Sequence, residues 1–225
     1  MLQDNLEIVQ KRLARAAAKR GISKEEITLI AVTKTIPLDK VYRAWELGIR
    51  NFGENRLQEA LPKISSLPSG LNWHFMGHLQ TNKVKDVLPF FKLIHSLDRL
   101  KLAHVLQKEA EKINRVVDVL VQVNIGSEET KYGFEPDKVE EALGEIVLLD
   151  RIKVKGLMAI APLVDNPEKV RTYFSGLNQL FKNLKVPGAM MKYLSMGMTN
   201  DFEVAVEEGS NMVRIGTALF GERVK

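Results

Sequence analysis

Apolar residues recur along the chain in two alternating patterns: short continuous runs and longer stretches at helical spacing. The plainest run, VVDVLVQVNI at 116–125, is rich in β-branched residues and predicts a strand. The predicted strands lie at about 28–34, 49–55, 71–78, 91–98, 116–125, 153–161, 192–198 and 211–221. Helices are predicted at about 37–47, 55–61, 99–113, 168–184 and 201–208, with shorter ones after Thr81 and Pro136.

The order of these elements indicates the fold class. Eight strands, each followed by a helix except the last, predict parallel βα units. Eight such units in 225 residues fit an α/β fold, a compact single-domain (β/α)8 (TIM) barrel spanning residues 1–225. Residues 1–22 carry an apolar stripe at helical spacing and predict an extra N-terminal helix, which packs on the barrel in place of the missing last helix. A doubly wound open sheet is the alternative.

Composition narrows the class of protein. The chain has no cysteine, which excludes disulfides and thiolate sites, and a cytoplasmic location is the simplest expectation. No apolar stretch approaches the roughly 20 residues of a membrane helix, and the charged N-terminus lacks a signal core. The net charge of +5 is weak evidence for nucleic acid. The basic residues of the first helix lack interleaved aromatic residues, so we expect neither a nucleic-acid nor a membrane partner.

Lys34 follows the first predicted strand and shares the parity of Ile30 and Val32. If those two side chains point into the barrel, the lysine does as well. Partial desolvation at a barrel mouth lowers the pKa of a lysine and raises the fraction of neutral amine. A neutral amine forms Schiff bases with aldehydes and ketones. The competing interpretation is a strand-end lysine that reaches into water. A lyase or aldolase that uses Lys34 without a cofactor is a further possibility.

The last two predicted strands suggest a phosphate site. Arg214 shares the parity of Met212 and should point inward, while Gly216 and Thr217 offer backbone N–H groups and a hydroxyl. Phosphate sites in such barrels recur in the loops after strands seven and eight, and Ser195 lies in the seventh. The sequence after that strand also resembles a helix cap formed by Asn200 and Glu203.

Other polar residues at strand ends are open to two interpretations. Asn55 with Gln58 resembles a cap of the helix at 55–61, and a ligand contact is the alternative. His74 and His78 lie four residues apart, but on a predicted strand and without acidic neighbours, so a metal site is not expected. Lys131 is either a solvated loop lysine or a second amine near the ligand.

Several motifs together resemble the pyridoxal-phosphate homeostasis protein family. The segments that carry the resemblance are AVTKTIP, NFGENRLQEA, WHFMGHLQTNKVK, VNIGSEETKYGF, GLMAIAP and LSMGMTNDFEVAVEEGSNMVRIGTALFGER, and the resemblance runs over about residues 28–223. The family is similar in fold to the barrel domain of alanine racemase.

The resemblance implies a cofactor and its contacts. It implies pyridoxal 5′-phosphate (PLP) bound as a Schiff base on Lys34, with the phosphate at Ser195, Gly216 and Thr217 and Arg214 at the pyridine nitrogen. Asn55 is a further candidate contact. The implied function is to carry or buffer the cofactor in intracellular vitamin B6 homeostasis, with apo PLP enzymes as possible recipients and a monomeric state. The alternative is a PLP-dependent amino-acid racemase, so whether the protein is an enzyme stays open.

Overall fold

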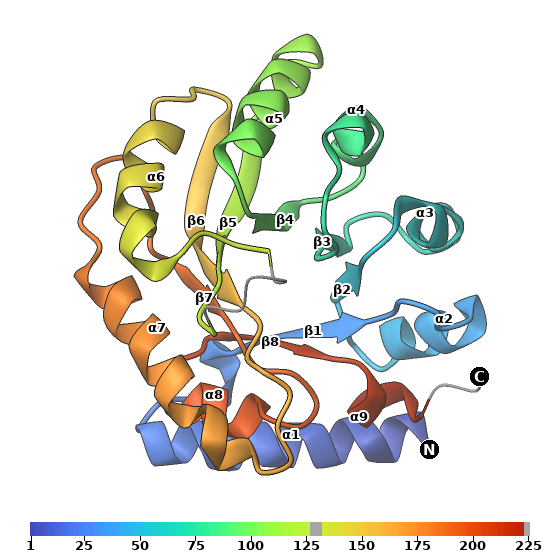
Figure 1. Ribbon diagram of the computed structural model, residues 1–225. Coiled ribbons are helices and arrows are strands. Elements are labelled where there is room, and N and C mark those ends of the chain that lie inside the picture. Colours follow the sequence, from blue (N-terminus) through green and yellow to red (C-terminus); the bar gives the residue numbers. More distant parts are fainter. Residues whose placement is uncertain (127–131, 223–225) are drawn as a thin grey trace.

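The computed structural model describes residues 1–126 and 132–222, and their strands close into a parallel barrel in the order β1 to β8 (Figure 1). The strands are β1 (Thr28–Val32), β2 (Asn51–Glu54), β3 (Asn72–Phe75), β4 (Leu93–Leu97), β5 (Val117–Val123), β6 (Ile152–Ala159), β7 (Tyr193–Ser195) and β8 (Met212–Ile215). Because β1 pairs with both β2 and β8, the predicted barrel is confirmed and an open sheet is excluded.

Helices surround the barrel (Figure 1). They are α1 (Leu2–Arg20), α2 (Leu38–Glu46), α3 (Leu57–Ser66), α4 (Val84–Val87), α5 (Leu100–Lys112), α6 (Val139–Ile146), α7 (Arg171–Asn183), α8 (Phe202–Glu207) and α9 (Thr217–Phe220). Short 3-10 turns η1 to η4 lie at Lys24–Glu26, Thr81–Lys83, Pro136–Lys138 and Pro167–Val170. Within the described ranges, no helix has the length and apolarity that a bilayer crossing requires.

The extra helix α1 lies along α8 and α9, as Figure 1 shows at the bottom of the view. Its predicted apolar stripe is buried at Leu6, Val9 and Leu13. Two of its basic residues bind α8, because Arg12 pairs with Glu203 at 2.7 Å and Lys19 with Glu207 at 2.7 Å. The expectation that no helix follows the last strand was wrong, since the short α9 follows β8 and packs against α1.

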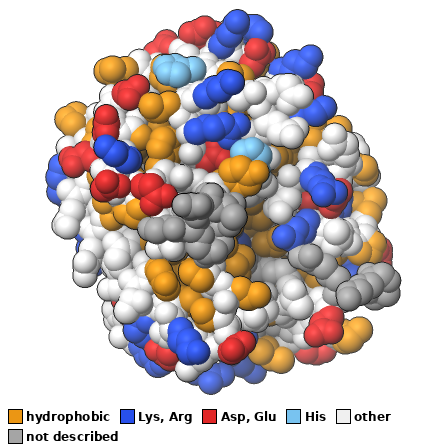
Figure 2. Space-filling model, viewed as in Figure 1, with side chains coloured by type: hydrophobic (Ala, Val, Ile, Leu, Met, Phe, Trp, Pro, Cys, Tyr) orange, Lys and Arg blue, Asp and Glu red, His pale blue; other side chains and the backbone are white. Residues whose placement is uncertain are grey.

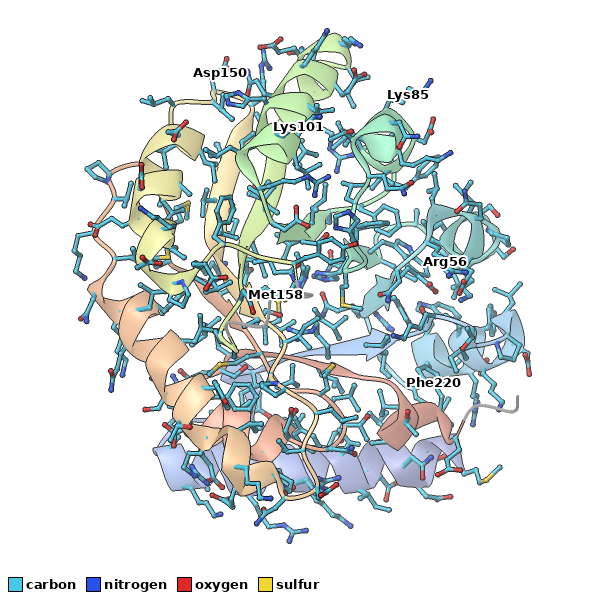
Figure 3. The ribbon with its side chains drawn as sticks, in the orientation of Figure 1. Arg56, Lys85, Lys101, Asp150, Met158 and Phe220 are labelled. Atoms are coloured by element: carbon cyan, nitrogen blue, oxygen red, sulfur yellow. The ribbon has the colours of Figure 1, made fainter. Side chains whose placement is uncertain are left out.

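Alternate residues of each strand face two different cores. Ile30, Leu93, Leu120, Met158 and Met212 form a small cluster inside the barrel, and Met158 is labelled near the middle of Figure 3. Ala31, Val213 and Ile215 belong instead to the large core between the strands and the helices. The predicted parity is therefore confirmed: Ile30 and Arg214, which are paired across β1 and β8, lie on the inner face.

Two predicted helix caps were wrong. Helix α3 has Arg56, not Asn55, as its N-cap, and it continues through Pro62 to Ser66. A proline removes one hydrogen bond of a helix, but here Lys63 lies directly after it and makes a buried ion pair that holds the next turn. Helix α8 begins after Asp201, and Glu203 turns to Arg12 instead of reaching back to a cap.

Candidate functional site

A cavity of about 520 Å³ opens at the carboxyl ends of β1 and β8. Its lining residues come from four strand ends and their loops: Val32, Lys34, Ile160, Ala161, Pro162, Leu163, Val164, Pro167, Met198, Thr199, Asn200, Asp201, Arg214, Gly216 and Thr217. Figure 2 views the molecule from the same direction as Figure 1, and apolar side chains gather around the middle of this face. The cavity therefore joins two basic side chains, Lys34 and Arg214, within a largely apolar wall.

Helix α3 holds the backbone on both sides of Lys34. The carbonyl oxygen of Thr33 accepts a hydrogen bond from Lys63 Nζ at 2.6 Å. The N–H of Thr35 donates to Glu59 Oε2 at 2.9 Å, and Thr35 itself has a φ of 62°, in the left-handed region that few non-glycine residues adopt. Because strain of this kind persists only where neighbours enforce it, the turn that presents Lys34 is a fixed feature of the site.

The ion pair beneath this turn is buried. Glu54 Oε1 accepts from Lys63 Nζ at 2.6 Å and from Thr33 Oγ1 at 2.6 Å. The side chain of Glu54 is 0% exposed, and that of Lys63 is 8% exposed. Sequence reasoning missed this pair. Glu54 stands at a predicted strand end, but no motif marks a helical lysine nine residues later as its partner.

Arg214 is anchored by neutral oxygen atoms. One Nη1 hydrogen bond goes to the Ser195 carbonyl at 2.8 Å and another to Ser195 Oγ at 2.7 Å. Nη2 donates to the Ala159 carbonyl at 2.8 Å. Burial lowers the pKa of Arg214 to about 10, so the guanidinium remains charged at neutral pH. These contacts use three of its five N–H donors, and no hydrogen bond to another described residue uses Nε–H or the second Nη2–H.

Only four of the six residues expected to contact the ligand line this cavity. Lys34, Arg214, Gly216 and Thr217 line the cavity. Ser195 is fully buried beneath it and bonds Arg214 through its hydroxyl.

Asn55 lines a separate cleft of about 540 Å³ between α3 and α4, together with Arg56, His78 and Lys83. Its carbonyl is packed so closely that a Cβ added at Gly77 would lie 2.2 Å from it. The cleft and the Lys34 cavity have no lining residue in common.

The two histidines that the sequence places four residues apart have different surroundings. His74 faces the barrel interior and bonds His95, with 3.0 Å between His74 Nδ1 and His95 Nε2. His78 bonds Asp98 at 2.8 Å and stacks on Tyr132 with ring centroids 3.7 Å apart. The parity of the strand residues could have pointed to the interior position of His74, but not to its partner. Lys131 lies outside the described residues.

Comparison with known proteins finds a matching family model and relatives that cover nearly the whole chain. The family described as alanine racemase, N-terminal domain, matches residues 2–224. The pyridoxal phosphate homeostasis protein of Aquifex aeolicus is 46% identical over 222 residues, which cover 98% of this chain and 97% of the relative.

Two solved structures extend this similarity. PipY of Synechococcus elongatus, with PLP bound, is 31% identical at a TM-score of 0.82, covering 98% of this chain and 100% of that one. An alanine racemase of Clostridium difficile shares the fold at 16% identity and a TM-score of 0.71, covering 99% of this chain and 58% of that one. The closed barrel, the strand-end lysine and these full-length similarities together place the chain in the pyridoxal phosphate homeostasis protein family, built on the alanine racemase N-terminal barrel.

Proposed function

We propose that this protein binds PLP as a Schiff base on Lys34 and carries or buffers it in intracellular vitamin B6 homeostasis. One observation carries the proposal: a single cavity brings the strand-end lysine together with a buried, charged arginine. PipY, similar over nearly the whole chain, has been solved with PLP bound. The Aquifex relative is named for PLP homeostasis.

The residues present fit this cofactor. A volume of about 520 Å³ lies within the usual range of small-molecule pockets. The protein's own packing leaves room for a side chain at Gly216, because an added Cβ would meet Val32 only at 3.5 Å. Since Gly216 and Val32 both line the cavity, a side chain at 216 would occupy space that the ligand needs.

The four expected ligand residues that line the cavity have proposed roles. Bound PLP supplies an aldehyde and an electron-withdrawing pyridine ring. The Lys34 amine would condense with the aldehyde with loss of water, and the Gly216–Thr217 segment would hold the phosphate. Arg214 donates an N–H toward the ring nitrogen and gives up no proton, because a guanidinium is donor-only. Ser195 acts through Arg214, and direct contacts of Ser195 or Asn55 with the cofactor stay predictions.

A PLP-dependent amino-acid racemase is the alternative. A racemase needs a second base on the opposite face of the substrate, and tyrosine is the residue that alanine racemase uses. Among the cavity-lining residues that the structure describes there is no tyrosine, which favours a carrier. Appearance of solvent deuterium at the α-carbon of an amino acid would favour the racemase, whereas no exchange across an amino-acid panel would favour the carrier.

The first experiment is the visible spectrum of the purified protein with PLP, before and after borohydride, followed by peptide mass mapping. We expect a band that disappears on reduction and a pyridoxyl mass on Lys34. The Lys34→Ala variant should lose both, while Lys40→Ala, an exposed lysine on α2, should retain them. A wild-type protein that gains no band and no label would overturn the proposal and return Lys34 to a solvated strand end.

Location and assembly form part of the same proposal. We expect a cytoplasmic monomer that passes PLP to apo PLP enzymes. Fractionation, light scattering after gel filtration, and transfer of PLP to an apo aminotransferase test these three points separately. A dimer in solution would contradict the monomer alone and leave the Lys34 assignment unaffected.

A further inference from the structure

A line of polar side chains crosses the barrel interior from its amino-terminal end to Arg214. The contacts, in order, are Lys92 Nζ to Asn72 Oδ1 at 2.8 Å, Asn72 Nδ2 to Asn51 Oδ1 at 3.0 Å, Asn51 Oδ1 to His74 Nε2 at 3.2 Å, His74 Nδ1 to His95 Nε2 at 3.0 Å, His95 Nδ1 to Ser195 Oγ at 3.2 Å and Ser195 Oγ to Arg214 Nη1 at 2.7 Å. We call these seven residues the interior relay. Lys92 is exposed, whereas His74, His95, Ser195 and Arg214 are buried.

The direction of the relay is fixed at Lys92. An ammonium is donor-only, so it requires the oxygen of the Asn72 amide to face it. The Asn72 nitrogen must then point to Asn51 and donate to the Asn51 oxygen. Because that same oxygen faces His74 Nε2, this ring nitrogen must carry a hydrogen.

The two histidines are neutral, and they continue the same donor–acceptor direction from Asn51 to Ser195. Burial lowers the pKa of His74 to about 3 and that of His95 well below its usual value, so both rings are neutral near pH 7. A neutral ring with its hydrogen on Nε2 accepts at Nδ1. His74 Nδ1 therefore accepts from His95 Nε2–H, and His95 Nδ1 must accept in turn from the Ser195 hydroxyl.

The far end agrees with this order. With its hydrogen directed to His95, the Ser195 hydroxyl presents a lone pair to Arg214, which can only donate. We propose that the interior relay positions Arg214 for the ligand, and that Lys92, Asn72, Asn51, His74 and His95 are positioning residues which act through the Ser195 hydroxyl. This inference rests on the proposed function for its ligand, PLP, but the order of the relay is a property of the protein alone.

The amino-terminal end of the relay is open to change. A small cavity of about 260 Å³ lies there and is lined by Asn51, Asn72, His74 and Lys92, among others. A substitution at this end alters the relay at a distance from the Lys34 cavity, whose lining shares no residue with it. An effect on PLP caused by such a substitution therefore does not come from a direct contact with the lining of the Lys34 cavity.

The first test reads the histidine tautomers by ¹⁵N NMR without PLP, which is tractable because the chain has four histidines. We expect Nε2–H tautomers for His74 and His95 in the wild type. The isosteric Asn72→Asp variant offers only acceptors to Asn51, so the Asn51 amide should turn and both rings should change to Nδ1–H. Asn183→Asp makes the same charge change on the exposed end of α7 and should change neither ring.

The second test measures PLP affinity and the visible spectrum with two His95 variants. Asparagine keeps an acceptor near the Nδ1 position that faces Ser195, whereas glutamine keeps only the distal donor that faces His74. His95→Asn should therefore bind PLP within about twofold of wild type, and His95→Gln about tenfold more weakly with a shifted band. Asn72→Asp should weaken binding by about three- to tenfold, and Asn183→Asp should not.

The outcomes separate the inference from the proposed function. An Nδ1–H wild-type His95, or an unchanged or doubly protonated ring in Asn72→Asp, would overturn the relay whether or not PLP binds. Changed tautomers with wild-type PLP affinity and spectrum would overturn the positioning role. If the wild type shows the expected tautomers but binds no PLP, the proposed function fails and the positioning role fails with it, while the relay order stands.

Discussion

Two buried cations of this barrel are held in opposite ways. Lys63 lies on α3 outside the barrel and meets the carboxylate of Glu54 at 2.6 Å. Arg214 lies inside, and its hydrogen bonds go to two carbonyl groups and one hydroxyl. No carboxylate of the described chain is within ion-pair distance of Arg214, although Asp201 is near enough to act on it through space.

The difference separates a structural charge from one that can act on a ligand. An ionised partner neutralises Lys63, whose remaining effect is to fix the Thr33 carbonyl beside Lys34. Neutral acceptors fix the position of Arg214 but leave its positive charge uncompensated at short range, in surroundings that screen it poorly. The first cation therefore shapes the turn, and the second is available to an anionic or electron-rich ligand.

The largest expected effect comes from breaking the outer pair. Lys63→Met leaves Glu54 buried without its partner and should lower the free energy of unfolding by about 3–5 kcal/mol. Urea unfolding followed by circular dichroism measures it. The double variant Glu54→Gln with Lys63→Met removes the stranded charge and should recover part of the loss. A loss below about 1 kcal/mol in the single variant would show that Lys63 is not the structural cation.

The matching change inside the barrel should weaken ligand binding and should cost less stability than the loss of Lys63. Arg214→Met leaves three neutral oxygen atoms of Ser195 and Ala159 without their donor, at a cost of about 1–3 kcal/mol. PLP affinity should fall at least about tenfold, measured by absorbance titration. Lys63→Met, titrated under conditions where it is folded, is the matched comparison. Equal binding losses in the two variants would contradict the distinction between the two cations.

Acid should disturb the inner region through its neutral histidines. The pKa of His74 is about 3 in the folded protein against about 6.5 for an unperturbed histidine, so below pH 6.5 the unfolded chain binds more protons. Stability therefore falls as pH falls, by about 2 kcal/mol through His74 between pH 7 and 5. Urea midpoints at both pH values measure this.

Two histidine variants identify the source of that pH dependence. His74→Gln should reduce it because glutamine does not titrate, while His95, whose pKa burial also lowers, should keep its own part. His104→Gln changes an exposed histidine of α5 and should leave it as in wild type. If His74→Gln keeps the full slope, His74 is not the group that acid protonates.

Much of the fold follows from local pattern. The apolar runs predicted all eight strands, because a strand covered on both faces must be apolar along its length. Strand parity placed Ile30 and Arg214 on the inner face, since side chains alternate with a period of two. The capping signals at Asn55 and Asn200 failed because tertiary partners reset the helix starts: Lys63 bonds Glu54, and Glu203 bonds Arg12.

The sequence by itself determined the eight strands, the strand-end position of Lys34 and the inward direction of Arg214, because each depends on periodicity within one element. The tertiary structure decided which side chains meet. Closure and register of the barrel bring Ser195 under Arg214, place His95 beside His74, and turn Asn55 to a separate cleft. Such contacts join residues up to 100 positions apart, and no local pattern records which of many polar residues will face each other across a closed sheet.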